Sequence, residues 1–339
     1  MRLCGERIEA TACSLVGALQ RRQDFNKWTD IEGFKMSKLL EGKVVIVTGA
    51  GRGVGAEIAK LAAREGASVV VNDLGGDERG EGGSLSPAQE VVNAIEAEGG
   101  QAIANGSSVA TWEGAHALVA AAIERFGRID AVVNNAGVLR DVIFHKMTEQ
   151  DWDVAVDVNL KGCFNVSRAA APHFKEQGGG VFLHMTSTSG LVGNIGQVNY
   201  GAAKMGVTGL SKCIALDMER FGVRSNCLAP FAFTRLVATI PADTEYNRAR
   251  LEKVKKMTPD TIAPLAVVLL SDSAADTNAQ VFGVRRNELF VFSQPRPVRS
   301  VHTAEGWTPA GILEHGLPSL RGAYVAMEKS PDVFSWDPI

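Results

Sequence analysis

Five short, largely apolar runs alternate along this chain with longer stretches that carry helix signals. The runs are Lys43–Thr48, Ser68–Asp73, Ile129–Gly137, Val181–Ser187 and Val223–Pro230. Continuous apolar runs of this length are typical of strands that are buried on both faces of a parallel sheet. Because parallel neighbours need right-handed crossover connections, the alternation predicts an α/β fold with a doubly wound parallel sheet.

The stretches between these runs are expected to be helices. Ala56–Glu65 and Trp112–Phe126 lie directly between predicted strands. The pair Ser86-Pro87 combines a capping serine with a proline suited to a first helical turn. Thr148–Asp151 resembles a capping box, and the helix that it opens is expected to run toward His173.

The chain of 339 residues divides into three parts. Residues 1–35 precede a methionine that opens MSKLLEGKVVIVTGAG, so we expect them to be a disordered extension or a non-native start. A targeting segment is the alternative, but this stretch has no convincing apolar region or cleavage site. Residues 36–286 are expected to form one domain, and residues 287–339 a C-terminal tail without an assigned role.

The composition excludes several classes of function. The 35 Lys and Arg residues are balanced by 38 Asp and Glu residues, so the basic excess of a nucleic-acid or membrane-surface binder is missing. No apolar run reaches the length of about eighteen residues that spans a bilayer. The five cysteines include no CxxC pair and the six histidines are scattered, which predicts a reduced, cytoplasmic protein without a metal site.

A glycine-rich turn, TGAGRGVG, follows the first predicted strand. Gly49, Gly53 and Gly55 give it the spacing T-G-x-x-x-G-x-G. Glycine permits the tight turn and lets a pyrophosphate approach backbone N–H groups at the N-terminus of the next helix. Because the turn joins a predicted strand to a predicted helix, and Asp73 ends the following strand, we expect a dinucleotide site.

Two charged residues bear on the choice of dinucleotide. Asp73 can accept hydrogen bonds from the adenosine ribose diol, and its charge would repel a 2′-phosphate, which favours NAD. Arg52 lies inside the glycine turn and could pair with such a phosphate, which favours NADP. We expect NAD, because a carboxylate beside a phosphate dianion is costly.

Tyr200 and Lys204 are four residues apart, so they share one face of a helix. A tyrosine pKa near 10 must fall by about three units before the phenolate forms at neutral pH, which requires roughly 4 kcal/mol. A neighbouring ammonium supplies about 4 kcal/mol in a partly dry cleft, and an oxidised nicotinamide adds to it. Ser187, at a strand end, can hydrogen-bond the substrate oxygen while Tyr200 transfers the proton.

Taken together, these motifs resemble the short-chain dehydrogenase/reductase family. The match from Leu40 to Val284 comprises TGxxxGxG, the NNAG sequence at Asn134–Gly137, the asparagine of VNLKG, and a serine thirteen residues before YxxxK. The resemblance implies a Rossmann-like sheet, a nicotinamide cofactor and a catalytic tetrad. The tetrad positions are Asn159, Ser187, Tyr200 and Lys204.

The resemblance also implies roles at the cofactor site. Lys204 would hold the nicotinamide ribose, and Asn159 would order a water relay. Two departures stand out: Ser108 replaces an adenine-contacting aspartate of many members, and Phe231 and Phe233 fill the usual PG region. The expected cofactor contacts are Gly49, Arg52, Gly53, Val54, Gly55, Asp73, Ser108, Val109, Asn135, Ala136, Gly137, Tyr200, Lys204 and Pro230.

A narrower resemblance suggests the substrate. VVVNDLGG, NNAGVLRD and STSGLVGNIGQVNY resemble the (3R)-hydroxyacyl-CoA dehydrogenase module of peroxisomal multifunctional enzymes, and bacterial hydroxysteroid dehydrogenases share these features. The resemblance therefore implies NAD-dependent interconversion of a secondary alcohol and a ketone. A 3-hydroxyacyl-CoA is the first candidate substrate and a hydroxysteroid the second.

Two alternatives remain open at this stage. One is an NADPH-dependent 3-oxoacyl-carrier-protein reductase, and the other is a non-catalytic dinucleotide-binding regulator. The substrate pocket is expected to include Arg235–Lys256. Members of the family are usually dimers or tetramers, which implies a homodimer or homotetramer with Asp151–His173 and Val198–Phe221 at the interface. The final residues, Trp336-Asp-Pro-Ile, are not a peroxisomal address, so the cytoplasm is the expected compartment.

Overall fold

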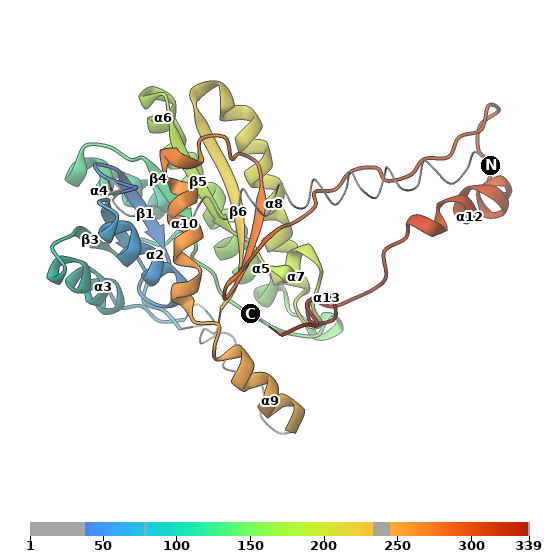
Figure 1. Cartoon of the computed structure of the whole chain (residues 1–339), viewed down its shortest axis with the longest axis horizontal. Helices are drawn as coiled ribbons and strands as arrows, with labels where there is room; N and C mark the ends of the chain where they lie inside the picture. The colour runs from blue at the N-terminus through green and yellow to red at the C-terminus, as the bar shows by residue number, and fades with distance from the viewer. Residues whose placement is uncertain (1–37, 78, 80, 233–244, 338–339) are drawn as a thin grey trace, which may run out of the picture. The chain divides into compact units, whose positions relative to one another are not determined.

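An eight-stranded sheet organises the computed structural model, which describes residues 38–77, 79, 81–232 and 245–337 (Figure 1). The strand order is β3-β2-β1-β4-β5-β6-β7-β8, and neighbours run parallel except for the antiparallel pair β7 and β8. The strands are β1 (Val44–Thr48), β2 (Ser68–Asn72), β3 (Gln101–Asn105), β4 (Ala131–Asn134), β5 (Gly180–Met185), β6 (Val223–Phe231), β7 (Val281–Arg285) and β8 (Glu288–Val291).

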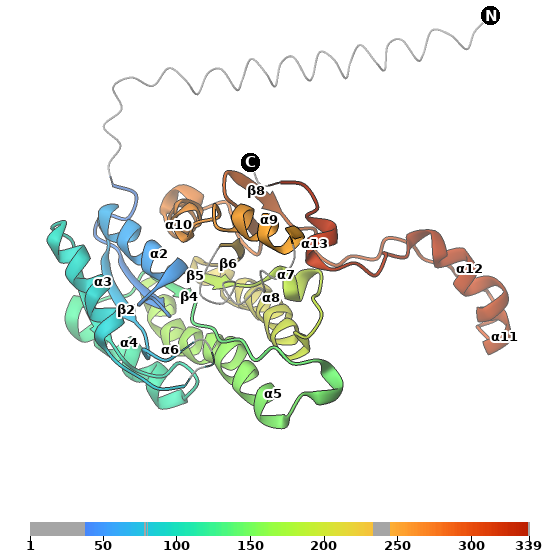
Figure 2. The same ribbon diagram turned by 90° about the horizontal axis from the view of Figure 1, so that it is seen from below.

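Helices connect the parallel strands and cover both faces of the sheet. Figure 2 shows the sheet between α10 on one side and α6 on the other. The helices are α2 (Gly53–Arg64), α3 (Ser86–Ala97), α4 (Trp112–Phe126), α5 (Glu149–Val156), α6 (Gly162–Gln177), α7 (Thr188–Leu191), α8 (Val198–Met218), α9 (Glu245–Val254), α10 (Ala263–Leu270), α11 (Pro309–Gly311), α12 (Leu317–Leu320) and α13 (Ser330–Val333). The predicted Rossmann-like, doubly wound α/β fold is confirmed.

Alternating side chains of the central strands feed two separate cores. Val45 and Val47 of β1 pack with α2, α3 and α10 on one face. Ile46, between them, faces the opposite core with residues of α4 and α6. Each fully buried side chain of this size contributes about 1.5–3 kcal/mol relative to an exposed one. The sheet is therefore held from both sides, as its continuous apolar runs require.

The five predicted strands are present, and three others were missed. β3 and β8 lie at the two edges of the sheet and are half exposed, so neither has a continuous apolar run. The central residue of β7 is a glycine, Gly283, which weakens the strand signal. Pairing makes these segments strands: β3 and β7 add as parallel neighbours, and β8 returns antiparallel on β7 through a two-residue hairpin.

The predicted helix from Thr148 contains an interruption. Thr148 does form a capping box with Asp151 at the start of α5. The chain then makes one wide turn of π-helix at Asp157–Lys161 before α6 continues to Gln177, beyond the expected end. Single wide turns of this kind are frequent at functional sites.

Some expectations fall outside the described residues. They concern the extension 1–35, Phe233, and residues 235–244 of the expected substrate segment. The later part of that segment contains α9. The C-terminal tail begins with β8, which extends the sheet.

Replacing Phe182 by alanine should lower the free energy of unfolding by about 3–5 kcal/mol, because truncating a buried aromatic side chain leaves a cavity. Phe182 is fully buried, and its ring centroid lies 4.8 Å from that of Phe174. Urea titration followed by circular dichroism measures the change. The matched control is Phe144→Ala at an exposed position, where we expect a change within about 0.5 kcal/mol. Equal losses in both variants would contradict this packing.

Candidate active site

The expected site residues lie mainly at the carboxyl edge of the sheet, where ligands bind in open α/β folds. The crevice falls between β1 and β4, because connections from these neighbours lead to opposite sides of the sheet. The positions are Gly49, Arg52, Gly53, Val54 and Gly55 after β1, Asp73 after β2, Ser108 and Val109 after β3, Asn135, Ala136 and Gly137 after β4, Ser187 after β5, Pro230 at the end of β6, Asn159 in the π-helical turn, and Tyr200 and Lys204 on α8.

Thr48 joins the ends of β1 and β4. Its Oγ1 accepts hydrogen bonds from the backbone N–H groups of Asn135 and Ala136, each at 3.0 Å. The Asn135 side chain returns the link, since its Nδ2 donates to Thr48 O and Gly49 O, each at 2.9 Å. The sequence had marked Asn135 and Ala136 as cofactor contacts, but the role of Thr48 was missed although it opens the glycine motif.

The glycine turn packs too closely for side chains. Gly49 and Gly53 have φ values of +61° and +57°, which L-residues with side chains rarely adopt. A Cβ atom on Gly49 would also lie 2.7 Å from Ala136 Cα, and one on Gly55 would collide with Asn135 Nδ2. The glycines therefore let the turn pack directly against the segment after β4, beside the N-terminus of α2, where a pyrophosphate would bind in the expected dinucleotide site.

Asp73 is fixed beside this turn. Its Oδ2 accepts from Gly51 N at 2.8 Å, and its Oδ1 accepts from Gly75 N at 2.7 Å. Each carboxylate oxygen keeps capacity for a further hydrogen bond. Arg52, by contrast, is exposed at the N-terminus of α2 and makes no side-chain capping bond. The carboxylate is thus held in the glycine-turn region, and the guanidinium faces solvent.

Ser108 and Val109 are placed by two buried asparagines. Asn72 Nδ2 donates to Ser107 O at 2.9 Å, and Asn165 Nδ2 donates to Val109 O at 3.0 Å. These contacts connect β2 and α6 to the segment after β3. The expected adenine-side residues are therefore held by side chains that the sequence interpretation did not include.

Asn159 is completely buried in the π-helical turn. Its Nδ2 donates to Val138 O at 3.0 Å and to Ala155 O at 2.8 Å, whereas its Oδ1 has no partner. A Cβ atom on Gly137 would lie 2.7 Å from Asn159 Oδ1 and 3.7 Å from Lys204 Nζ. Gly137 therefore leaves open a small space that both an unsatisfied acceptor and an ammonium border.

Lys204 is 3% exposed, an unusual state for a lysine. Its Nζ donates to Met185 O at 2.8 Å, at the end of β5, and lies 5.6 Å from the ring centroid of Tyr200. The Thr186 hydroxyl donates to Lys204 O at 2.7 Å and so holds this part of α8 against the strand. The predicted shared helix face of Tyr200 and Lys204 is confirmed.

Ser187 begins a chain of side-chain hydrogen bonds. Its Oγ accepts from Ser189 N at 3.1 Å and donates to Ser189 Oγ at 3.2 Å. Ser189 Oγ donates to Gln197 Oε1 at 2.7 Å, and Gln197 Nε2 donates to Asp141 Oδ2 at 2.8 Å. Partial burial raises the pKa of Asp141, with the Gln197 contact opposing the effect. All three residues lie within the motifs NNAGVLRD and STSGLVGNIGQVNY, but the motifs assign them no role.

The other reactive groups in this region are held inactive. Burial, assisted by the charge of Lys204, lowers the pKa of His184 to about 3, so its imidazole is neutral at physiological pH. Burial raises the pKa of Cys163 to about 11 and that of Cys227 to about 12. Neither thiol is therefore an activated nucleophile. Tyr200 is left as the acid–base candidate beside Lys204.

The described part of the chain lacks two features, a metal-binding cluster and a membrane-spanning helix. Among residues 38–77, 79, 81–232 and 245–337, no cluster of three or more His, Cys, Asp or Glu side chains is arranged to hold a metal ion. No helix within those ranges has the length and apolar character needed to cross a membrane.

Comparison with known sequences assigns the chain to a family. The family model for short chain dehydrogenases matches residues 43–244. A short-chain type dehydrogenase/reductase of Mycobacterium tuberculosis is 46% identical over 245 residues, which are 72% of this chain and 82% of that protein. A hydroxyacyl-CoA dehydrogenase of the same organism is 36% identical over 290 residues, covering 80% of this chain and 87% of the relative. The mouse peroxisomal multifunctional enzyme type 2 is 43% identical over 245 residues, which are 72% of this chain but only 32% of the mouse protein.

Solved structures agree with this assignment. A short chain dehydrogenase from Mycobacterium avium superimposes with a TM-score of 0.72 at 36% identity, covering 84% of this chain and 96% of that one. A 7α-hydroxysteroid dehydrogenase in complex with NADH and 7-oxo glycochenodeoxycholic acid gives a TM-score of 0.67 at 31% identity, covering 74% and 96%. The chain therefore belongs to the short-chain dehydrogenase/reductase family and is an oxidoreductase that acts on CH–OH groups.

Proposed function

We propose that this enzyme uses NAD to interconvert a secondary alcohol and a ketone, and that its substrate is a 3-hydroxyacyl-CoA. The observation that carries the reaction type is the buried Lys204 ammonium, 5.6 Å from the ring centroid of Tyr200. At this separation the ammonium can attract negative charge that develops on the phenol during proton transfer.

In the oxidative direction, Tyr200 takes the proton from the substrate hydroxyl. A bound nicotinamide supplies the hydride acceptor. Ser187 stabilises the substrate oxygen: its hydroxyl can turn from Ser189 Oγ to the substrate, because the Ser189 N–H continues to hold the Ser187 oxygen. In the reductive direction Tyr200 returns the proton to the ketone oxygen.

Asn159 and Lys204 would hold the water that relays the proton away from Tyr200. The free Oδ1 of Asn159 and the Lys204 ammonium border the same space beside Gly137. A water in that space can donate to Asn159 Oδ1 and accept from Lys204 Nζ, which satisfies both groups. The second buried amide contact, from Asn159 Nδ2 to Ala155 O, keeps the acceptor aimed at this space.

Asp73 supports NAD over NADP. Two backbone amides fix its carboxylate beside the glycine turn, so it can receive the ribose hydroxyls without rearranging. The same charge opposes a 2′-phosphate, and the exposed Arg52 is not arranged to neutralise it. The Asp73 carboxylate also disfavours the rival function, an NADPH-dependent 3-oxoacyl-carrier-protein reductase.

The substrate class is supported by the relatives. The hydroxyacyl-CoA dehydrogenase of M. tuberculosis covers most of both chains, so the similarity is not limited to the dinucleotide-binding part. The hydroxysteroid dehydrogenase structure keeps a hydroxysteroid as the second candidate. Absorbance of the NADH formed, measured with a panel of 3-hydroxyacyl-CoA substrates and a panel of hydroxysteroids, shows which class has the higher kcat/KM.

Tyr200→Phe should reduce kcat by a factor of at least about 100, because the phenol transfers the proton. The Kd for NADH should change less than twofold, since the hydroxyl is not expected to bind the cofactor. Stopped-flow turnover and a fluorescence titration measure the two quantities. Tyr324→Phe, at an exposed tyrosine far along the chain, is the control and should behave as the wild type. Normal kcat in Tyr200→Phe would refute the mechanism.

Asp73→Ser should reduce or invert the preference for NAD. The wild type should favour NAD over NADP by about tenfold or more in kcat/KM, because the carboxylate repels the 2′-phosphate. In the variant that repulsion is gone, so the exposed Arg52 can pair with the phosphate. The companion variant Arg52→Ala should leave the wild-type preference unchanged. A wild-type preference for NADP would show that Arg52 governs this pocket.

We also propose a homodimer or homotetramer with α6 and α8 at the interface. Phe164 on α6 and Met205 and Leu216 on α8 are large apolar side chains that are exposed in the isolated chain. Leu216→Glu should therefore shift the mass measured by light scattering to a smaller species. The control Leu289→Glu places the same charge on β8, where Leu289 is similarly exposed. Dissociation by the control alone would instead place the interface at β8.

A further inference from the structure

The end of the chain returns to the loop that lies between Ser187 and Tyr200. Ser330 N and Oγ both donate to Gly193 O, at 3.0 and 3.3 Å. Gly193 lies between α7 and α8, and Ser330, which begins α13, is buried. Figures 1 and 2 both show α13 beside α7. Residues 330–337, here called the C-terminal segment, thus contact the loop that joins α7 to α8, between the expected catalytic residues Ser187 and Tyr200.

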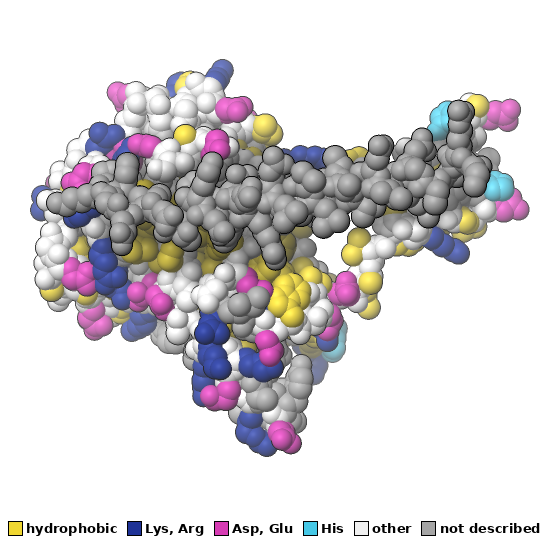
Figure 3. All heavy atoms as spheres, in the orientation of Figure 1, with side chains coloured by type: hydrophobic (Ala, Val, Ile, Leu, Met, Phe, Trp, Pro, Cys, Tyr) yellow, Lys and Arg dark blue, Asp and Glu magenta, His cyan; other side chains and the backbone are white. Residues whose placement is uncertain are grey.

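Aromatic rings attach the same segment to the end of β6. The Phe334 ring centroid lies 4.7 Å from that of Phe231, 5.5 Å from Phe290 and 6.0 Å from Phe292. Phe231 directly follows Pro230, which we expect at the cofactor site. These rings are half buried, so part of their surface remains available. Figure 3 shows hydrophobic side chains gathered between α9 and α13.

Arg285 fixes the backbone of the segment. It is 3% exposed and pairs with Glu288 at 2.6 Å. Its Nη1 donates to Phe334 O at 3.4 Å and to Trp336 O at 3.0 Å, and its guanidinium carbon lies 4.6 Å from the centroid of the Trp336 ring. Trp336 Nε1 in turn donates to Glu288 Oε1 at 2.6 Å. A buried guanidinium with these partners gives the segment one defined position.

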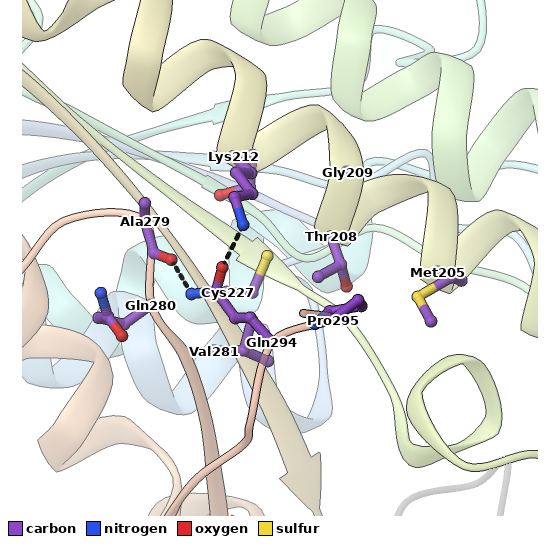
Figure 4. A pocket seen from close by; sticks show the side chains of 11 residues that line it. Met205, Thr208, Gly209, Lys212, Cys227, Ala279, Gln280, Val281, Gln294 and Pro295 are labelled. Carbon is purple, nitrogen blue, oxygen red and sulfur yellow. Dashed lines mark hydrogen bonds between the residues drawn. The ribbon is translucent and has the colours of Figure 1, made fainter. Parts of the chain in front are cut away.

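A second attachment holds the chain where it leaves the sheet. Lys212 Nζ on α8 donates to Gln294 Oε1, and Gln294 Nε2 donates to Ala279 O, both at 2.6 Å (Figure 4). These residues line a pocket of about 280 Å³ that includes none of the expected catalytic or cofactor residues. The chain after β8 is therefore fixed at Gln294 and again at residues 330–337.

We propose that the C-terminal segment forms the outer wall of the substrate pocket, and that Phe334 determines specificity for the apolar part of the substrate. The inference rests on the proposed function. The segment contacts the loop after Ser187, the end of β6 and, through the Lys253–Asp337 ion pair, α9 of the expected substrate segment. Half-buried aromatic surface at a site entrance suits an extended acyl chain, which gains apolar contact with each added methylene.

Phe334→Ala tests this wall with 3-hydroxyacyl-CoA substrates of 4, 8 and 16 carbons. We expect kcat/KM to fall by a factor of at least about 10 for the longest chain and less than about twofold for the shortest, because only the long chain reaches the ring. The Kd for NADH should not change. Phe334→Leu should recover part of the loss, and Met327→Ala, at a fully exposed position of the same tail, is the control.

Hydrogen exchange of residues 191–197 gives a readout independent of turnover. Loss of the Phe334 contacts should speed exchange in this loop, whereas Met327→Ala should not. If Phe334→Ala changes neither the dependence of kcat/KM on acyl-chain length nor the hydrogen exchange of residues 191–197, the C-terminal segment does not form the wall. An equal loss for all chain lengths, together with weaker NADH binding, would also overturn it, because it would show general damage. A wild type that oxidises hydroxysteroids but no 3-hydroxyacyl-CoA would refute the proposed acyl substrate. In that case the hydroxysteroid kcat/KM of Phe334→Ala tests the wall: a loss would support it, and an unchanged value would contradict it.

Discussion

The hydrogen bonds that Thr48 Oγ1 receives from Asn135 N and Ala136 N organise the carboxyl edge of the sheet. They join two segments that are 87 and 88 residues apart in sequence, where neighbouring strands would otherwise separate toward their own helices. With the ends of β1 and β4 tied, the glycine turn lies against Asn135 and Gly137 faces Asn159. A dinucleotide and a proton path can then share one crevice.

The buried ammonium of Lys204 imposes a second constraint. An isolated charge in the interior is costly, and lysine escapes this cost by losing its proton unless polar groups surround it. Met185 O supplies one acceptor. The free Asn159 Oδ1 borders the same space, so the remaining N–H groups of Lys204 have polar surroundings that a relay can use. The groups that make the buried charge tolerable are also those proposed to move the proton.

The sequence predicted those parts of the fold and site that have a local pattern. Continuous apolar runs located the five central strands, and motif spacing located Tyr200 and Lys204 on one helix face. Edge strands such as β3 and β8 lack that local signal, since most of their residues are only partly buried or are exposed. For the same reason the contacts of Phe334 with Phe231 could not be inferred, because about a hundred residues separate two rings that carry no shared periodicity.

The side-chain network at Ser187 shows another limit. Ser189, Gln197 and Asp141 are common polar residues, and only the folded loop aligns their donors and acceptors. By contrast, the glycine positions were predictable because a physical constraint, positive φ or close approach, restricts which residue fits. Site residues were predictable where a physical constraint limits the residue type at a position. They were not predictable where ordinary polar residues acquire a role only through their arrangement in the folded chain.

The wide turn at Asp157–Lys161 acts as a one-residue insertion in an otherwise regular helix. One additional residue rotates everything downstream by about 100° relative to an uninterrupted α-helix. Asn159 faces inward within the wide turn, and the rotation that the turn introduces determines that Phe164 faces outward on α6. In the proposed assembly, the proton relay and the subunit contact would be uncoupled along a single helix: substitutions on the outer face of α6 would change the association of subunits while the inward amide keeps its position.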